Sequence, residues 1–428
     1  MNNSYYHVSD GIFYDSMRWL LHSGIRITDA PDRGAIYGWK NLGGSSSSSS
    51  HSLAYPFIYS EITGYAVTFF SWLYSELKTD ESIQSAKLSA DWIIKNMASS
   101  SASLLVAGQA QEDGFVGKGD ISNQVYAFDN GVIIFGLLSL YKLTNDSILL
   151  AAAEKITNSL IQHFFYESSK VISSALLDTN FKPVLYGKGK WSTLPGPYHS
   201  KLALAFLELY RITNNNLYSK VAEALCNFAM TFQKPGGRFI TNPDAENDTF
   251  LHPHLYACEG LIYAGINDQH NTNDYLNAGL KGLVWAMQQI KPNGGLPRRS
   301  TGEEGENIDE KEKEEQSDCM AQLLRLLIIC DSDLLKKMLK GKDDDDDMMI
   351  DKSIELLHRR LLDFYISSGS DRGAFKYHLS LKSACSWCTM FSSQAIRLWS
   401  KRKRNELEQK QRKGKKENEN IRWIDFYI

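Results

Sequence analysis

The chain has 428 residues, of which 43% are hydrophobic and 23% are charged, as is typical of a globular protein with a large core. Its net charge of −3 supplies no basic field that would attract nucleic acid. No apolar run reaches the roughly 18 residues needed to cross a membrane, and the polar N-terminal segment lacks the pattern of a signal peptide. We therefore expect a cytoplasmic protein with reduced cysteines.

Apolar residues recur at helical spacing along most of the chain, first in one segment and then in successive pairs of segments. Within a pair the linker is short and polar, as at 78–80 and 144–146, and its Asp or Asn can cap the second helix. The predicted helices cover residues 10–24, 62–77, 81–97, 130–143, 148–165, 200–212, 217–232, 255–265, 275–290, 319–330, 349–365 and 383–399.

The connections between pairs are longer and contain Gly, Pro and strand-like pieces. Because short linkers join antiparallel neighbours, these long loops should all lie at one end of a helical bundle. The first helix can serve as the outer partner of the last inner helix, which closes a ring. The sequence therefore predicts an all-α (α/α)6 toroid of about twelve helices with short β-hairpins in the long loops. It would span residues 1–400, with a charged tail at 401–428.

A short cluster of polar and aromatic residues precedes each inner helix, so the ring would bring six clusters together at one end. Carboxylates and imidazoles suit proton transfer, and Tyr and Trp offer flat faces and polar groups for sugar rings. The candidates for catalysis are Glu61, Asp129, His199, His254 and Asp318. The candidates for substrate binding in these clusters are Tyr65, Tyr126, Asn130, Tyr198, Tyr256, Glu259, Gln322 and Trp387.

Each candidate also has a purely structural explanation. Asp129 and Asp318 stand where Asp commonly caps a helix. His252 and His254 flank Pro253 in a turn, and the tyrosines could simply fill the core. The recurrence favours a site, because capping accounts for an acid at a helix start but not for the aromatic residue beside it.

Three loops that resemble short hairpins place basic residues near the same end, and Arg298, Arg372 and Tyr377 are further candidates for substrate binding. A guanidinium group fits a carboxylate or phosphate, so a uronic acid or sugar phosphate is a plausible ligand, with solvated surface ion pairs as the alternative. Cys385 and Cys388 lack the context of a redox or zinc motif, and no histidine at a matching position accompanies the Asp-Cys pair at 318–319. We predict no metal ion and no cofactor.

Residues 128–131 (Phe-Asp-Asn-Gly), with the apolar run at 137–141 and the turn at 144–146, resemble the six-hairpin glycosidase superfamily. That superfamily includes unsaturated glucuronyl hydrolases and N-acylglucosamine 2-epimerase-like proteins. The stretch 255–261 is similar in style, and the resemblance extends over roughly residues 10–399. A hydrolase would use inner-helix carboxylates, which implies Asp129 with Glu61 or Asp318. An epimerase would use inner-helix histidines, which implies His199 and His254.

Our first hypothesis is therefore an enzyme that acts on a sugar or uronic acid by acid–base chemistry, through glycoside hydrolysis or epimerisation. The second is a toroid of the prenyltransferase or terpenoid-cyclase kind, but the aspartate run at 343–347 falls at the short-turn end, away from the expected site. The third is a non-catalytic toroid that binds glycans or proteins. No feature of the sequence indicates an oligomeric state.

Overall fold

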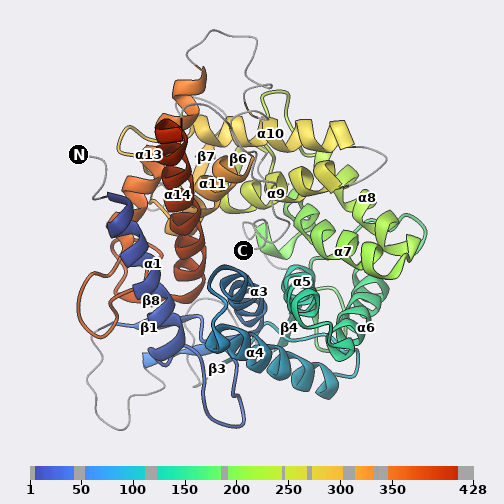
Figure 1. Cartoon of the computed structure of the whole chain (residues 1–428). Coiled ribbons are helices and arrows are strands. Elements are labelled where there is room, and N and C mark those ends of the chain that lie inside the picture. Colours follow the sequence, from blue (N-terminus) through green and yellow to red (C-terminus); the bar gives the residue numbers. More distant parts are fainter. Residues whose placement is uncertain are drawn as a thin grey trace.

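Twelve α-helices in the described part of the chain form an inner and an outer ring (Figure 1). The computed structural model describes residues 5–42, 54–110, 123–184, 191–242, 246–267, 272–301, 314–330, 335 and 346–412. The serine run at 45–50 and residues 343–345 of the aspartate run lie outside them. The inner helices are α3 (Ser60–Leu77), α5 (Ala127–Thr144), α7 (Ala203–Thr213), α9 (Leu251–Asn267), α11 (Ser317–Ile329) and α14 (Ser386–Arg412). The outer helices are α4 (Asp80–Ser99), α6 (Ser147–Phe164), α8 (Asn216–Met230), α10 (Thr272–Gln288), α13 (Asp346–Leu361) and α1 (Tyr5–His22).

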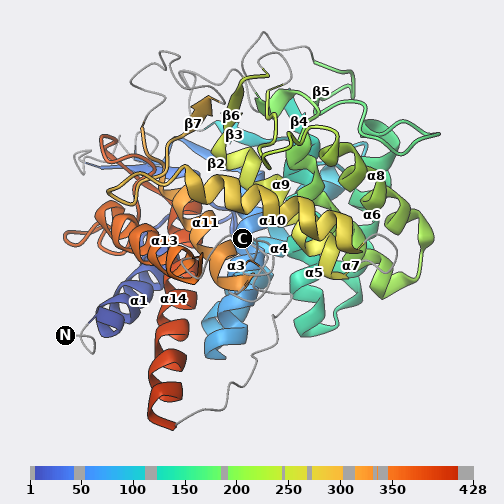
Figure 2. The ribbon, with the colours of Figure 1, turned by 90° about the horizontal axis from the view of Figure 1, so that it is seen from above.

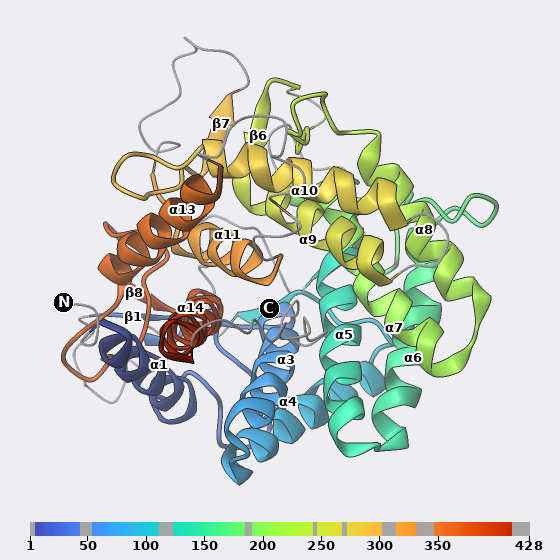
Figure 3. The same cartoon turned by 45° about the horizontal axis from the view of Figure 1, so that its top comes forward.

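The inner ring is closed. Each inner helix packs against the next, from α3 through α5, α7, α9 and α11 to α14, and α14 returns to α3 (Figure 3). Each outer helix packs on the inner helix before it, except that α1 packs on α14 at the other end of the chain. The predicted (α/α)6 toroid, with the first helix as the outer partner of the last, is confirmed.

Burial explains which helices are inner and which are outer. Helix α5 is apolar on all sides, and every residue from Ala127 to Leu140 is buried, as expected for a helix surrounded by others. Helix α8 buries Tyr218, Val221, Ala222 and Leu225, a spacing that places one apolar stripe against the inner ring. No helix within the described residues is both long and apolar enough to cross a membrane.

The turns at the end away from the long loops follow one pattern. Helices α3, α5 and α7 end at Lys78, Asn145 and Asn214, whose left-handed φ angles are 56°, 55° and 56°. The side chains of Asp146 and Asn215 then accept hydrogen bonds from the first turns of α6 and α8. Capping of the second helix by the linker is thereby confirmed at these two positions.

Within the residues that the structure describes, four two-stranded antiparallel sheets join the long loops. The strand that leads into an inner helix pairs with the strand that follows the next outer helix, so each sheet joins two successive long loops instead of folding back within one. The expected short hairpins occur beside these sheets, as antiparallel bridges within single loops at Gln233 with Phe239 and at Tyr365 with Phe375. The sheets themselves span a whole helix pair. The pairs are β1 (Trp39–Asn41) with β8 (Ser383–Cys385), β2 (Phe57–Tyr59) with β3 (Gly108–Ala110), β4 (Gln124–Tyr126) with β5 (Leu176–Asp178), and β6 (Asp248–Phe250) with β7 (Arg299–Thr301).

These sheets place the start of the inner helices at one end of the toroid. Figure 2 shows strands β2 to β7 along one side of the ring and the C-terminal part of α14 extending from the opposite side. That extension is tied to the body, since Arg404 lies 2.7 Å from Asp10 and Lys401 lies 2.6 Å from Glu76. Helix α14 continues past residue 400, the boundary that we predicted for the tail, as far as Arg412. Residues 413–428 lie outside the described part of the chain.

A glycine with positive φ marks four of the long loops, at the point where the loop touches the backbone of an outer helix. At Gly237 the φ angle is 96°, and an added Cβ would lie 2.3 Å from the carbonyl oxygen of Lys281 in α10. A side chain there would be strained and would also clash with helix backbone. The same arrangement recurs at Gly34 against Leu88, Gly294 against Leu356, and Gly373 against Asp15.

We predict that Gly237→Ala lowers the free energy of unfolding by about 1–3 kcal/mol, because it adds backbone strain and a contact with Lys281. Gly236→Ala is the matched control, since a Cβ at Gly236 meets nothing within 4 Å. Thermal and denaturant unfolding of the two variants measures the difference. Equal stability of both would contradict the role given to Gly237.

Candidate functional site

The inner helices begin around a common axis at the strand end of the toroid (Figures 2 and 3). Glu61, Asp129 and Asp318 lie in the first turns of α3, α5 and α11. The free N–H groups and positive partial charge of helix N-termini favour carboxylates at these positions. The predicted clusters therefore converge, and we call the side chains around the axis the axial site.

The floor of the axial site is a buried group of charged residues and tyrosines. The hydroxyls of Tyr65 and Tyr256 are 2.8 Å apart. Lys201 Nζ lies 4.2 Å from the centre of the Tyr256 ring and 3.0 Å from Glu259 Oε2. Arg325 donates to Glu259 Oε1 at 2.8 Å. These five side chains come from α3, α9, α11 and the short 3-10 helix Pro197–Leu202 that leads into α7, and all are less than a tenth exposed.

Burial strongly affects the ionisation of this group. It lowers the pKa of Lys201 to about 8, against the opposing attraction of Glu259, so the ammonium form still predominates at neutral pH. Burial also raises the pKa of Tyr65 and Tyr256 well above the usual value for tyrosine, which keeps both hydroxyls protonated. The floor thus presents the ammonium group of Lys201, which is also paired with Glu259, and the neutral hydroxyls of Tyr65 and Tyr256. Both kinds of group can bind oxygen atoms of a ligand.

Beside the floor, at the rim, Asp318 contacts residues from two other helices. Its Oδ2 accepts a hydrogen bond of 3.1 Å from the indole of Trp387 and lies 3.5 Å from Nδ1 of His252. The His252 ring packs edge-on against Tyr256 at 4.4 Å between ring centres. His252 and Trp387 are partly exposed, so this rim is the accessible side of the axial site.

Besides burial, the charges of Asp129 and Glu61 both raise the pKa of the same residue, Tyr59. Burial, followed by the charges of Asp129 and then Glu61, raises the pKa of Tyr59 well above its usual range. Glu61 also raises the pKa of Tyr65 and Tyr256 in the floor. Two carboxylates from adjacent inner helices therefore lie close to one tyrosine at the edge of the axial site.

Aromatic rings line one wall of the axial site. Phe128 lies between Tyr256 and Tyr198, at centre-to-centre distances of 4.8 and 5.6 Å. Trp191 packs edge-on against Tyr198 at 5.0 Å and faces His252 at 6.1 Å. Flat rings of this kind stack on the apolar faces of sugars.

The two histidines predicted for catalysis are placed differently from His252. Both ring nitrogens of His254 bond backbone groups, namely the N–H of Phe239 and the carbonyl of Gly282 in α10, so this side chain faces the outer ring. His199 is fully buried, and its Nδ1 accepts from the N–H of Gly196. Burial lowers the pKa of His199 to about 3 and that of His254 to about 4, which makes both poor bases near neutral pH.

The remaining predicted residues divide between the site and the scaffold. The Tyr377 ring packs against Trp387 at 5.7 Å. Burial raises the pKa of the Cys319 thiol well above its usual range, and the charge of nearby Arg298 only partly opposes that shift, so Tyr377 and Arg298 both lie near the rim. Gln322 is buried, and neither its amide oxygen nor its nitrogen has a hydrogen-bond partner. Three of the predicted residues bond elsewhere: Asn130 to the backbone of Leu105 and Tyr126, Arg372 to Asp15, and Tyr126 through its hydroxyl to Gln124.

Two central residues, Lys201 and Arg325, were missing from the sequence prediction. Each is a single basic residue within an apolar inner-helix run, KLALAFLEL for Lys201 and LLRLLII for Arg325. A charged residue at the buried position of such a run requires a partner. A lone basic residue in an apolar inner-helix run is therefore the sequence feature that could have identified Lys201 and Arg325 as site residues.

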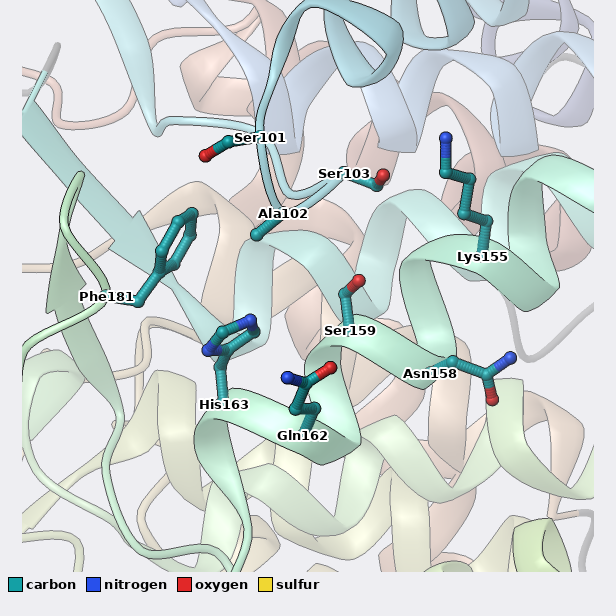
Figure 4. Close-up of a pocket in the computed structure, with 9 residues that line it drawn as sticks. All are labelled: Ser101, Ala102, Ser103, Lys155, Asn158, Ser159, Gln162, His163 and Phe181. Atoms are coloured by element: carbon teal, nitrogen blue, oxygen red, sulfur yellow. The ribbon is translucent and has the colours of Figure 1, made fainter.

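A depression lies outside the ring, between the loop after α4 and helix α6 (Figure 4). This cavity of about 440 Å³ is lined by polar side chains, including Lys155 and Gln162, and by the rings of His163 and Phe181, whose centres are 4.6 Å apart. Its lining contains no carboxylate. The axial site, with the four acids Glu61, Asp129, Glu259 and Asp318, is therefore better equipped for acid–base chemistry.

We predict that Glu259→Gln lowers the free energy of unfolding by about 3–5 kcal/mol, because it leaves the buried charges of Arg325 and Lys201 without their anion. Glu246→Gln is the control: it removes the partner of Lys234, 3.3 Å away, from a pair in which Glu246 is 70% exposed. Its effect should stay below about 1 kcal/mol. Denaturant unfolding compares them, and a small loss for both would mean that Glu259 is not essential to the floor.

No protein-family model matches the sequence. A segment of 153 residues, 35% of the chain, is 28% identical to mannosyl-oligosaccharide 1,2-alpha-mannosidase mans-2 of Caenorhabditis elegans. The match spans 26% of that protein's length.

Solved structures match nearly the whole chain. A sugar epimerase from a ruminal bacterium has a TM-score of 0.66 at 14% identity, over 91% of this chain and 99% of its own. A D-mannose isomerase has a TM-score of 0.67 at 12% identity, over 94% and 100%. An unsaturated glucuronyl hydrolase specific for heparin has a TM-score of 0.62 at 9% identity, over 92% and 98%. The chain therefore has the (α/α)6 toroid fold of these sugar epimerases, isomerases and glucuronyl hydrolases, as its resemblance to the six-hairpin superfamily implied.

Proposed function

We propose that this protein is a carbohydrate-active enzyme that hydrolyses a glycoside by acid–base chemistry in the axial site. The observation that carries the proposal is the pair of carboxylates Glu61 and Asp129. They lie in the first turns of adjacent inner helices and, besides burial, the charges of both raise the pKa of Tyr59. Glycoside hydrolysis commonly uses two such groups, one as the acid that protonates the leaving oxygen and one as base or nucleophile.

The rest of the site supports a sugar as the ligand. Aromatic rings form one wall, and the floor offers Lys201 and the hydroxyls of Tyr65 and Tyr256. Both amide atoms of Gln322 and the amide nitrogen of Gln394 are buried without a hydrogen-bond partner. Since unpaired buried polar groups are costly, a hydroxyl-rich ligand or bound water would satisfy them. The cations Lys201 and Arg298 further favour a ligand that carries a carboxylate, such as a uronic acid.

Epimerisation is the second candidate, because one histidine does face the axis. His252 lies beside Asp318 at the rim, and Lys201 has a pKa of about 8, so a base and an acid are both available for proton transfer next to a carbonyl. Several solved structures with the same fold carry the names of sugar epimerases or isomerases.

For the cellular location we propose the cytoplasm, because the six cysteines are all free and buried.

We predict that Glu61→Gln and Asp129→Asn each reduce turnover by about 10²–10⁴-fold, because each removes a group that transfers a proton in the reaction. Proton NMR of the purified protein with a panel of neutral, amino and uronic glycosides identifies the substrate and distinguishes cleavage from epimerisation. Asp146→Asn is the control, since Asp146 caps α6 at the far end of the toroid and Asn preserves that cap. Turnover that survives both substitutions would refute the assignment of Glu61 and Asp129.

A further inference from the structure

Three side chains able to bind a metal ion meet at the rim of the axial site. A ligand atom of His252, a carboxylate oxygen of Asp318 and the sulfur of Cys319 all lie within 4.8 Å of one another. The sequence shows an adjacent Asp and Cys without a histidine at matching spacing. The fold supplies that histidine from the preceding inner helix, because α9 packs directly against α11.

The immediate surroundings leave this cluster incompletely satisfied. Nδ1 of His252 is buried without a hydrogen-bond partner, although it points to within 3.5 Å of Asp318 Oδ2. The indole N–H of Trp387 and the backbone N–H of Cys319 hold the two carboxylate oxygens of Asp318 in place. Such outer partners orient ligands in metal sites.

We propose that His252, Asp318 and Cys319 bind a zinc-like divalent transition-metal ion. Imidazole, carboxylate and thiolate together suit zinc and its neighbours, whereas magnesium and calcium prefer oxygen ligands alone. On binding, the Cys319 thiol releases its proton to solvent, and the thiolate and carboxylate then balance the two positive charges. Tetrahedral bonds of about 2.0–2.3 Å hold ligand atoms roughly 3.3–3.8 Å apart, so the side chains need to close by only about one ångström.

Three protein ligands leave a fourth position open, as in catalytic rather than structural zinc sites. His252 borders Tyr256 of the floor and Trp191 of the aromatic wall. The open position would therefore face the axial site and accept an oxygen atom of the ligand. The ammonium of Lys201 lies near His252, and its charge is offset there by Glu259.

Cobalt titration of the chelator-treated full-length protein tests the proposal, because cobalt bound to a thiolate gives a charge-transfer absorption in the near-ultraviolet. We expect roughly one cobalt ion per chain, the charge-transfer band, and competition by zinc but not by magnesium. His252→Ala and Asp318→Asn should weaken binding by about tenfold or more. Cys319→Ser should remove the band. Cys226→Ser is the control, since Cys226 is buried in outer helix α8 and its loss should leave the spectrum unchanged.

The absence of the band in the wild-type protein would overturn the proposal, and so would a band that persists in Cys319→Ser. Circular dichroism and thermal unfolding show whether each variant is folded, and the wild-type spectrum decides the question even where a variant is not. The metal site is independent of the proposed hydrolysis. Glu61→Gln should retain full cobalt binding while losing turnover, so failure of one proposal is distinguishable from failure of the other.

Discussion

The antiparallel pairing of β1 with β8 is the constraint on which the rest of the structure depends. It joins residues 39–41, after the first helix, to residues 383–385, before the last, and so closes the ring. The three other sheets repeat the same connection between successive long loops. Because a strand leads directly into α3, α5, α9 and α14, these helices must begin at the same end of the toroid. The positive ends of their dipoles therefore face one another, and acids in the first turns, such as Glu61 and Asp129, are stabilised there.

Closing the ring also determines what fills its centre. Lys201, Glu259 and Arg325 meet there with almost no exposure to solvent. Well-packed apolar side chains of similar volume would often give equal or greater stability than a buried ion pair. A charged floor is therefore explained better by what it can bind than by what it adds to folding. The unpaired amide atoms of Gln322 and Gln394 beside this floor lead to the same conclusion, since such groups are usually satisfied by partners, water or ligand.

The helices and their closure into a ring could be predicted from the sequence, because the apolar period of a helix depends only on local spacing. The partner of each strand could not, since it depends on the whole ring. The direction in which a side chain points from its helix could not be predicted from the sequence either. His252 and His254 are two residues apart, which is about 200° on a helix. One therefore faces the axis beside Asp318 and the other faces α10, and the sequence pattern is the same for either choice. Lys201 and Arg325 converge only once three helices are placed together.

The most direct test of the account is a crystal structure of the Glu61→Gln variant soaked with the glycoside that the wild-type protein turns over. The account predicts a sugar on the axis, with its face against Phe128 or Tyr256 and its hydroxyls near Lys201, while the groove between α6 and the loop after α4 stays free of sugar. A sugar bound in that groove beside His163 and Phe181, with none on the axis, would contradict the central claim that the converging starts of the inner helices form the site.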